Sequence, residues 1–195
     1  MNSPGRNVLS LVPLLLATLM AACTETSVAP DTGASPDRAA EISDGAGRVS
    51  PSAIPRSTLR AWIGGLRQAT LPYRSLAAAR AAGFDARLTD CMESSSGGMG
   101  VHWGDLSRFD GVVEELRPEI LLYEPQPSGA KRLVAVEYAV PFTAWTADAP
   151  PELNGVAFHR NNTFGLWILH VWAWKENPSG ALQDWNPRVT CRWAD

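Results

Sequence analysis

Residues 119–140 read EILLYEPQPSGAKRLVAVEYAV, two apolar runs separated by a segment that contains Pro, Ser and Gly. Apolar runs on either side of a turn-forming segment predict a β-hairpin. If Glu124 faces Arg132 beside the turn, the two side chains form an ion pair, and Leu122 faces Val134 on the same side of the hairpin. This register predicts an apolar ladder that is closed by one ion pair.

The second face of the hairpin carries two carboxylates. The same register puts Glu119 opposite Glu137, with Tyr123 on the same side. Carboxylates that face each other repel unless a proton, a cation or a basic side chain lies between them. The second face is therefore predicted to line a pocket. An offset register, or an arginine from another segment beside the pair, would make it ordinary packed structure instead.

Helical and strand-like segments flank the hairpin. One helix is predicted from an N-cap at Ser57 and a second from Thr70 to Gly83, because apolar residues recur there at spacings of three and four. Strand-like runs occur at residues 84–91, 99–103, 119–124, 132–140 and 166–174. The fold is predicted to be α+β, with an N-terminal helix or helix pair packed on an antiparallel β-sheet of about five strands.

Two of the three histidines fall in strand-like runs. Alternation in the last run puts His170 on the same side as Trp172. An imidazole among indoles is partly desolvated, which lowers its pKa and favours the neutral, metal-binding form. A metal site made of His102, His170 and Glu137 would suit Zn²⁺, Mn²⁺ or Cu²⁺. The alternative is a buried histidine that hydrogen-bonds to backbone or carboxylate.

The N-terminus has the layout of a signal peptide. Residues 8–20 form an uncharged, mainly apolar run, shorter than the roughly 20 residues that a permanent membrane span needs. Residues 23–55 lack aromatic side chains and are rich in Ala, Ser, Pro and Gly, a composition typical of disorder. The sequence predicts a signal peptide at 1–22, a lipidated cysteine and disordered tether at 23–55, and a single globular domain at 56–195.

The apolar run ends in Leu19-Met20-Ala21-Ala22-Cys23, which resembles the lipobox of bacterial lipoproteins. The resemblance implies that Cys23 is acylated, becomes the new N-terminus and anchors the protein in a membrane. Thr24, in place of Asp, implies transport to the outer membrane, with the protein facing the periplasm or the cell surface. The alternative is cleavage after the alanines with Cys23 left unmodified.

The number of cysteines agrees with this interpretation. Three cysteines are an odd number for a chain that enters an oxidising compartment. If Cys23 is lipidated, Cys91 and Cys191 remain and are predicted to form a disulfide. Two buried thiols are the alternative.

The charge balance bears on the partners of the protein. Lys and Arg number 17 against 20 Asp and Glu, which gives a net charge of −3 at pH 7. A mildly acidic chain argues against nucleic acid as a partner. The predicted partners are the membrane, through the lipid anchor, and a small molecule or an envelope protein.

Five short motifs lie between residues 73 and 191: Gly97-Gly98-Met99-Gly100-x-His102, Pro118-Glu119-x-Leu121, Val136-Glu137-Tyr138, Leu169-His170-x-Trp172-x-Trp174 and Trp185-Asn186-Pro187. Through them, this part of the chain resembles a group of exported bacterial proteins of unassigned function. The resemblance covers most of the predicted globular domain and implies no particular activity.

Three functions are compatible with these features. The preferred hypothesis is an envelope lipoprotein that binds a small ligand or a partner through Glu119, Tyr123, Glu137 and Trp172. The rival hypothesis is a metal-binding protein or a metal-dependent, hydrolytic enzyme that uses His102, His170 and Glu137, with a carboxylate as general base. A structural envelope protein is the third hypothesis.

Overall fold

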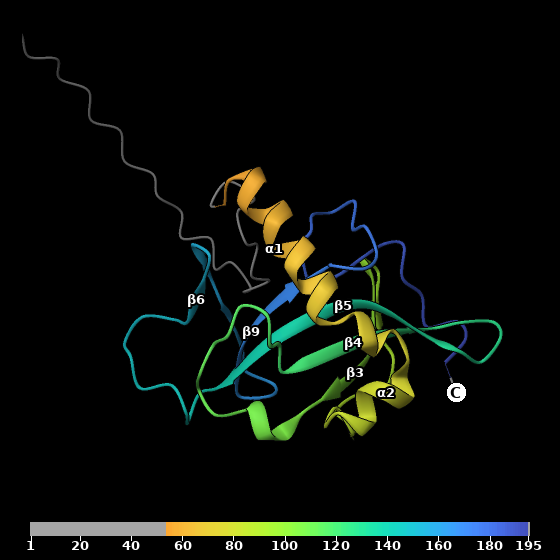
Figure 1. Cartoon of the computed structure of the whole chain (residues 1–195), viewed down its shortest axis with the longest axis horizontal. Coiled ribbons are helices and arrows are strands. Elements are labelled where there is room, and N and C mark those ends of the chain that lie inside the picture. Colours follow the sequence, from red (N-terminus) through yellow and green to blue (C-terminus); the bar gives the residue numbers. More distant parts are fainter. Residues whose placement is uncertain (1–53, 195) are drawn as a thin grey trace, which may run out of the picture. The chain divides into compact units, whose positions relative to one another are not determined.

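The computed structural model of the chain describes residues 54–194 (Figure 1). The signal peptide, the acylation of Cys23 and almost all of the tether lie outside these residues and stay predictions. The described part is α+β, with helices first and a mostly antiparallel sheet after them, as predicted. Among residues 54–194, no helix has both the length and the apolar character needed to cross a membrane.

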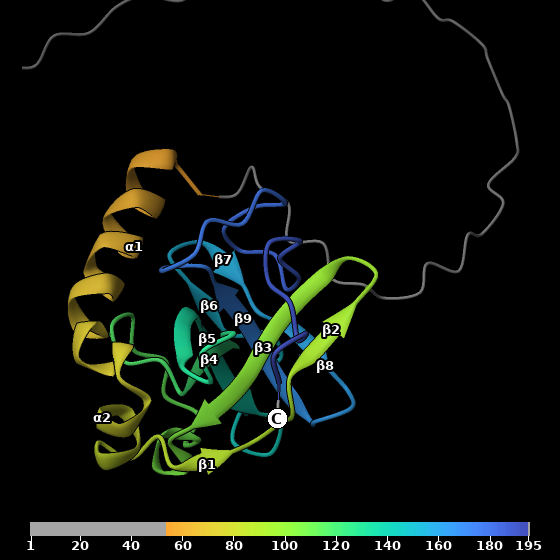
Figure 2. The ribbon, with the colours of Figure 1, turned by 90° about the vertical axis from the view of Figure 1, so that its right-hand side faces the viewer.

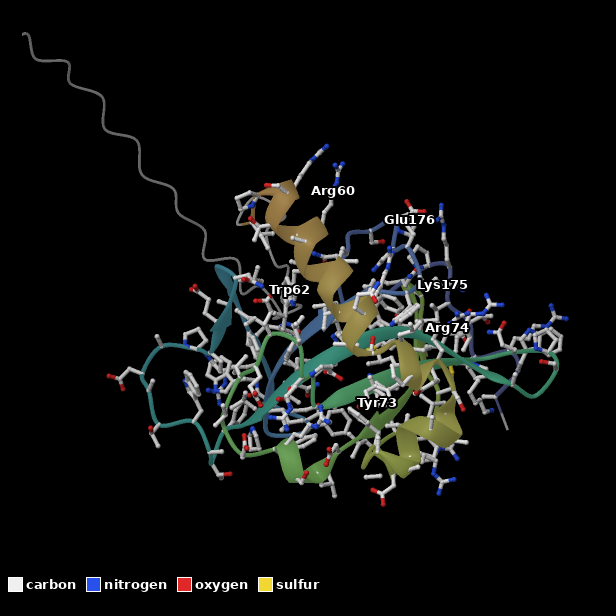
Figure 3. All side chains as sticks on the ribbon, viewed as in Figure 1. Arg60, Trp62, Tyr73, Arg74, Lys175 and Glu176 are labelled. Carbon is white, nitrogen blue, oxygen red and sulfur yellow. A yellow bond between two sulfur atoms is a disulfide. The ribbon has the colours of Figure 1, made fainter. Side chains whose placement is uncertain are left out.

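The first helix, α1 (Arg56–Ala69), packs on the sheet through one face. Its buried residues are Trp62 and Leu66, four positions apart, which is the spacing of one helix face. Figure 3 shows the side chain of Trp62 on α1. Its indole N–H donates a hydrogen bond of 3.1 Å to the hydroxyl of Tyr138 in the sheet. The helix begins after Pro55, so Ser57 lies in its first turn. The prediction that Ser57 is the N-cap is therefore wrong.

The second helical segment is split in two. Thr70 precedes a 3-10 helix, η1 (Leu71–Arg74). The helix α2 (Leu76–Ala81) follows, and its N-cap is Ser75, whose side chain accepts a hydrogen bond from the backbone N–H of Ala78. Gly83 follows with a φ of 110°, a conformation that glycine adopts without strain. The predicted end of this segment at Gly83 therefore agrees with the structure.

The sheet has seven strands in the order β1-β3-β4-β5-β9-β8, with β2 paired to β3. Their bounds are β1 (Ala86–Arg87), β2 (Met92–Ser94), β3 (Gly97–Gly104), β4 (Ile120–Pro125), β5 (Lys131–Pro141), β8 (His159–Asn161) and β9 (Leu166–Val171). A separate hairpin consists of β6 (Glu152–Leu153) and β7 (Val156–Ala157), and a short 3-10 helix, η2 (Leu106–Arg108), follows β3. The strands outnumber the predicted five because β2 and β8, of three residues each, are too short to show a pattern of alternation.

Both faces of the sheet are buried. Figure 2 shows α1 and α2 together on one side of it, and the helix-side core lies between them and the strands. The opposite face, which we call the site face, carries a second apolar cluster that includes Met99, Ile120, Ile168 and Trp172. Val189 and Trp185 pack on this cluster, so the C-terminal segment covers part of the site face.

The register of β4 and β5 agrees with the prediction only beside the turn. Glu124 pairs with Arg132 as predicted, although its carboxylate is held by Nζ of Lys175 at 2.7 Å. Leu122 then pairs with Ala135, because Val134 is an extra residue in β5 and forms a bulge. A one-residue shift turns the side chains beyond the bulge to the other face.

The bulge separates the two carboxylates that were predicted to face each other. Glu137 pairs with Ile120 and lies on the site face, so the predicted opposition of Glu119 and Glu137 is wrong. Alternation along β4 places Glu119 on the same side as Leu121, which belongs to the helix-side core. There the carboxylate of Glu119 accepts a hydrogen bond of 3.0 Å from the backbone N–H of Ala139.

The C-terminal segment is linked in two ways to the β2–β3 hairpin and the residue that precedes it. Cys91 and Cys191 form a pair with disulfide geometry and Cα atoms 5.6 Å apart, as predicted. Gly98 also forms an isolated β-bridge with Asn186. A Cβ atom on Gly97 would lie 2.3 Å from the carbonyl oxygen of Asn186, so this close approach requires glycine.

Candidate metal site

Three strands bring His102, Glu137 and His170 together on the site face. They come from β3, β5 and β9, and His170 is the direct cross-strand neighbour of Glu137. Nε2 of His102 lies 3.5 Å from Oε2 of Glu137, and Nε2 of His170 lies 3.7 Å from its Oε1. One ligand atom from each residue lies within 4.8 Å of the others. The three residues predicted as metal ligands are therefore adjacent.

These three side chains are almost completely removed from solvent. The exposed fraction is 4% for His102, 5% for Glu137 and 1% for His170. Polar groups at this depth are destabilising unless hydrogen bonds, ion pairs or a metal compensate for the lost hydration. Their arrangement therefore depends on what else they contact.

Both histidines of the cluster, His102 and His170, contact a second polar group through Nδ1. Nδ1 of His102 lies 2.9 Å from the hydroxyl oxygen of Thr89, and Nδ1 of His170 donates to Oδ1 of Asp184 at 3.1 Å. Metal-binding histidines commonly use their second ring nitrogen in this way, which orients the ring and selects the tautomer. Here both Nε2 atoms are directed toward Glu137.

Asp184 also contacts the third histidine. Nε2 of His159 donates to its second oxygen, Oδ2, at 3.1 Å, so one carboxylate bridges His159 and His170. The sequence reasoning missed Thr89, Asp184 and His159 as members of the site. They lie on separate segments that only the folded chain brings together, and no short spacing in the sequence indicated them.

The pKa values of the two buried histidines are shifted in opposite directions. Burial, together with nearby His170, lowers the pKa of His102 to about 3. Burial also opposes the charged form of His170, but Glu137 and Asp184 outweigh it and raise the pKa of His170 to about 9, so the lowered pKa predicted for His170 is wrong. Burial raises the pKa of Glu137. The positive charge that stabilises the carboxylates is therefore concentrated on His170.

The donor set fits a divalent transition metal. Nε2 of His170 is buried and has no hydrogen-bond partner among residues 54–194. Two imidazole nitrogens and one carboxylate form a common set of protein ligands for Zn²⁺, and the same donor types bind Mn²⁺ and Cu²⁺. The separations of 3.5 and 3.7 Å across Glu137 are compatible with one ion between ligands about 2 Å from it.

A cavity of about 1090 Å³ adjoins the cluster, with all three residues in its lining. Its wall includes apolar side chains from several strands, and Asp184 and His159 also line it. At its rim Ser96, Asn162 and Ser179 are exposed to solvent. The cavity therefore connects the buried cluster with the surface, in a volume typical of small-molecule sites.

The other predicted ligand-binding residues lie elsewhere. Tyr123 is buried in the helix-side core, where its hydroxyl donates to the carbonyl of Tyr73, and Glu119 lies on the same side of the sheet. Trp172 is on the site face, but its indole N–H donates to the carbonyl of Gln183 and it is not part of the cavity lining. Of that set, the structure brings only Glu137 to the cavity.

Comparisons of the chain with protein-family models, with curated proteins and with solved structures gave no match.

Proposed function

We propose that this protein is an envelope lipoprotein whose domain binds one divalent transition metal through His102, Glu137 and His170. The observation that carries the proposal is the convergence of three ligand atoms within 4.8 Å, in a buried place where both imidazoles turn Nε2 toward the carboxylate. A purely structural cluster would be expected to satisfy its buried polar atoms internally. The unsatisfied Nε2 of His170 instead suits a metal ligand.

The metal changes the energetics of the cluster. Without metal, Nε2 of His170 has only the 3.7 Å ion-pair contact with Glu137 and no hydrogen bond, and bound metal would replace that contact with a coordinate bond. Binding would also displace the proton that His170 holds, because a ligating imidazole must be neutral. The bound protein is therefore expected to be more stable than the metal-free protein.

A metal-dependent hydrolase is the second candidate, and the cavity is the observation in its favour. Three protein ligands leave at least one coordination position for water or substrate, as in catalytic zinc sites. The ion would lower the pKa of bound water and polarise a carbonyl group. His159, held by Asp184, lies in the cavity wall and is the imidazole outside the ligand set that we infer to assist proton transfer.

The location outside the cytoplasm is part of the proposal. The lipobox-like segment ending at Cys23 supports acylation and membrane attachment. The pairing of Cys91 with Cys191 supports an oxidising compartment. Metabolic labelling with palmitate tests the anchor: the wild-type chain should incorporate the label and a Cys23→Ala variant should not. Equal labelling of both chains would contradict acylation at Cys23.

Metal content and calorimetric titration of the purified full-length chain test the metal site. We expect one Zn²⁺ per chain, a loss of at least tenfold in affinity for Glu137→Gln, and a lower melting temperature after chelation. Glu119→Gln is the matched control, since it also removes a buried carboxylate but on the opposite face of the sheet. Absence of stoichiometric metal, with a melting temperature that chelator leaves unchanged, would refute the proposal.

A further inference from the structure

We propose that the cavity binds a small carboxylate-bearing molecule with an apolar body, and that its carboxylate ligates the metal. This inference rests on the proposed metal site. The charge of the cluster, the wall of the cavity and the scarcity of other cations together assign a chemical class to the ligand that the cavity takes.

The charge of the metal site favours an anionic ligand. A divalent ion held by one carboxylate and two neutral imidazoles leaves one positive charge in the coordination sphere. Asp184 does not ligate in this arrangement, because both of its oxygens are bound by His159 and His170. Asp184 balances this charge only from behind the ring of His170, so an anionic oxygen at the open position would lie closer to the ion and interact with it more strongly.

The wall of the cavity favours an apolar body. Met92, Met99, Phe109, Ile120 and Ile168 line it, and they come from four strands and the segment after η2. Burying apolar ligand surface on such a wall contributes roughly 25 cal/mol per Å². A molecule with an anionic head would bind the metal at the cluster, and its apolar body would pack against these side chains.

The scarcity of cationic side chains in the cavity wall favours a carboxylate over a phosphate as the ligand. Arg160 is the only Lys or Arg in the described lining, and its guanidinium lies 4.0 Å from the ring centroid of Phe142 and 4.8 Å from that of Trp167. Phosphate sites usually provide several cationic or backbone N–H donors. A single negative charge, which the metal can neutralise alone, is the better match.

Calorimetry on the Zn²⁺-loaded full-length chain tests the class of ligand, with three probes. They are 4-phenylbutyrate, 4-phenylbutan-1-ol, which lacks the carboxylate, and acetate, which lacks the apolar body. We expect 4-phenylbutyrate to bind at least tenfold more tightly than either of the others. Removal of the metal should weaken its binding by at least the same factor.

Two variants that introduce opposite charges at one position of the cavity wall test whether the ligand is an anion. Met92 is half-buried, so Met92→Lys should strengthen 4-phenylbutyrate binding and Met92→Glu should weaken it, each by several-fold. Leu106→Glu is the control, because Leu106 is 61% exposed and lies outside the cavity. The zinc content of every variant is measured in parallel.

The outcomes separate this inference from the metal site itself. If zinc binds stoichiometrically but the acid and the alcohol bind equally, or the acid binds equally without metal, the inference is overturned and the metal site stands. The same holds if both Met92 variants change affinity in the same direction. If no zinc binds, the metal site fails and the inference fails with it.

Discussion

Glu137 and His170 face each other directly across the β5–β9 pair, with 3.7 Å between Oε1 of Glu137 and Nε2 of His170. Behind the imidazole, Nδ1 is held at 3.1 Å by Asp184. The ring of His170 is thus fixed between two carboxylates, one inside the proposed coordination sphere and one outside it. Because Asp184 is the outer carboxylate that holds the ring of His170, it is the first residue to mutate.

Replacement of Asp184 by Asn is expected to weaken zinc binding by about tenfold to a hundredfold, the usual effect of removing an outer partner of a metal-binding histidine. The amide no longer supplies the negative charge that holds Nδ1–H of His170 in place. Competition with a chromogenic chelator measures the change. Asp90→Asn, at an exposed carboxylate that pairs with Arg87, should leave the affinity unchanged. Equal affinities for both variants would contradict the role of Asp184.

Glu119 is expected to make the stability of the domain dependent on pH. Burial is the main cause that raises its pKa, from 4.5 to about 8 in the folded protein. Between these values the folded state retains a proton that the unfolded state has lost, so this group's contribution to stability falls as pH rises from about 4.5 to about 8. Glu119→Gln keeps an acceptor for Ala139 and removes the titration.

Chemical denaturation at pH 5 and pH 8 tests this expectation. The free energy of unfolding of Glu119→Gln, relative to the wild type, should be higher at pH 8 than at pH 5 by up to a few kcal/mol. An identical difference at the two pH values would show that Glu119 does not titrate in this range.

Gly97→Ala is expected to destabilise the fold through the C-terminal segment. The new Cβ would meet the backbone of Asn186 at 2.3 Å, in addition to the strain of a φ of 120°. Gly129→Ala is a matched control, since Gly129 also has a positive φ but nothing within 4 Å of its Cβ position.

Thermal and urea denaturation should show a larger loss for Gly97→Ala, by about 2 kcal/mol or more. Because Asp184 precedes the displaced segment, zinc affinity should also fall in this variant. Equal stabilities of the two alanine variants would exclude the close approach to Asn186.

The Cys91–Cys191 link closes a loop with a sequence separation of 100 residues. Chain entropy predicts that its removal costs up to about 4.7 kcal/mol. The double variant with serine at both positions should therefore lose several kcal/mol in urea denaturation under non-reducing conditions. Cys23→Ser should not lose stability, and a double variant as stable as the wild type would contradict the link.

Local patterns in the sequence were sufficient for the main elements. The recurrence of apolar residues at spacings of three and four predicted the first helix, and Gly83 marked the end of the second helical segment, because both signals depend only on neighbours in the chain. The apolar runs around residues 126–130 likewise predicted the β4–β5 hairpin. Cysteine counting predicted the pair formed by Cys91 and Cys191.

The tertiary structure alone decided the composition of the site. The extra residue Val134 in β5 placed Glu137 on the site face and left Glu119 on the other, and a bulge depends on pairing between strands rather than on either strand's own pattern. Residue types and alternation made His102 and His170 candidates. Their contacts with Thr89 and Asp184 join residues 13 and 14 positions apart on neighbouring segments, and the path of the chain between them is set by the packing of the sheet.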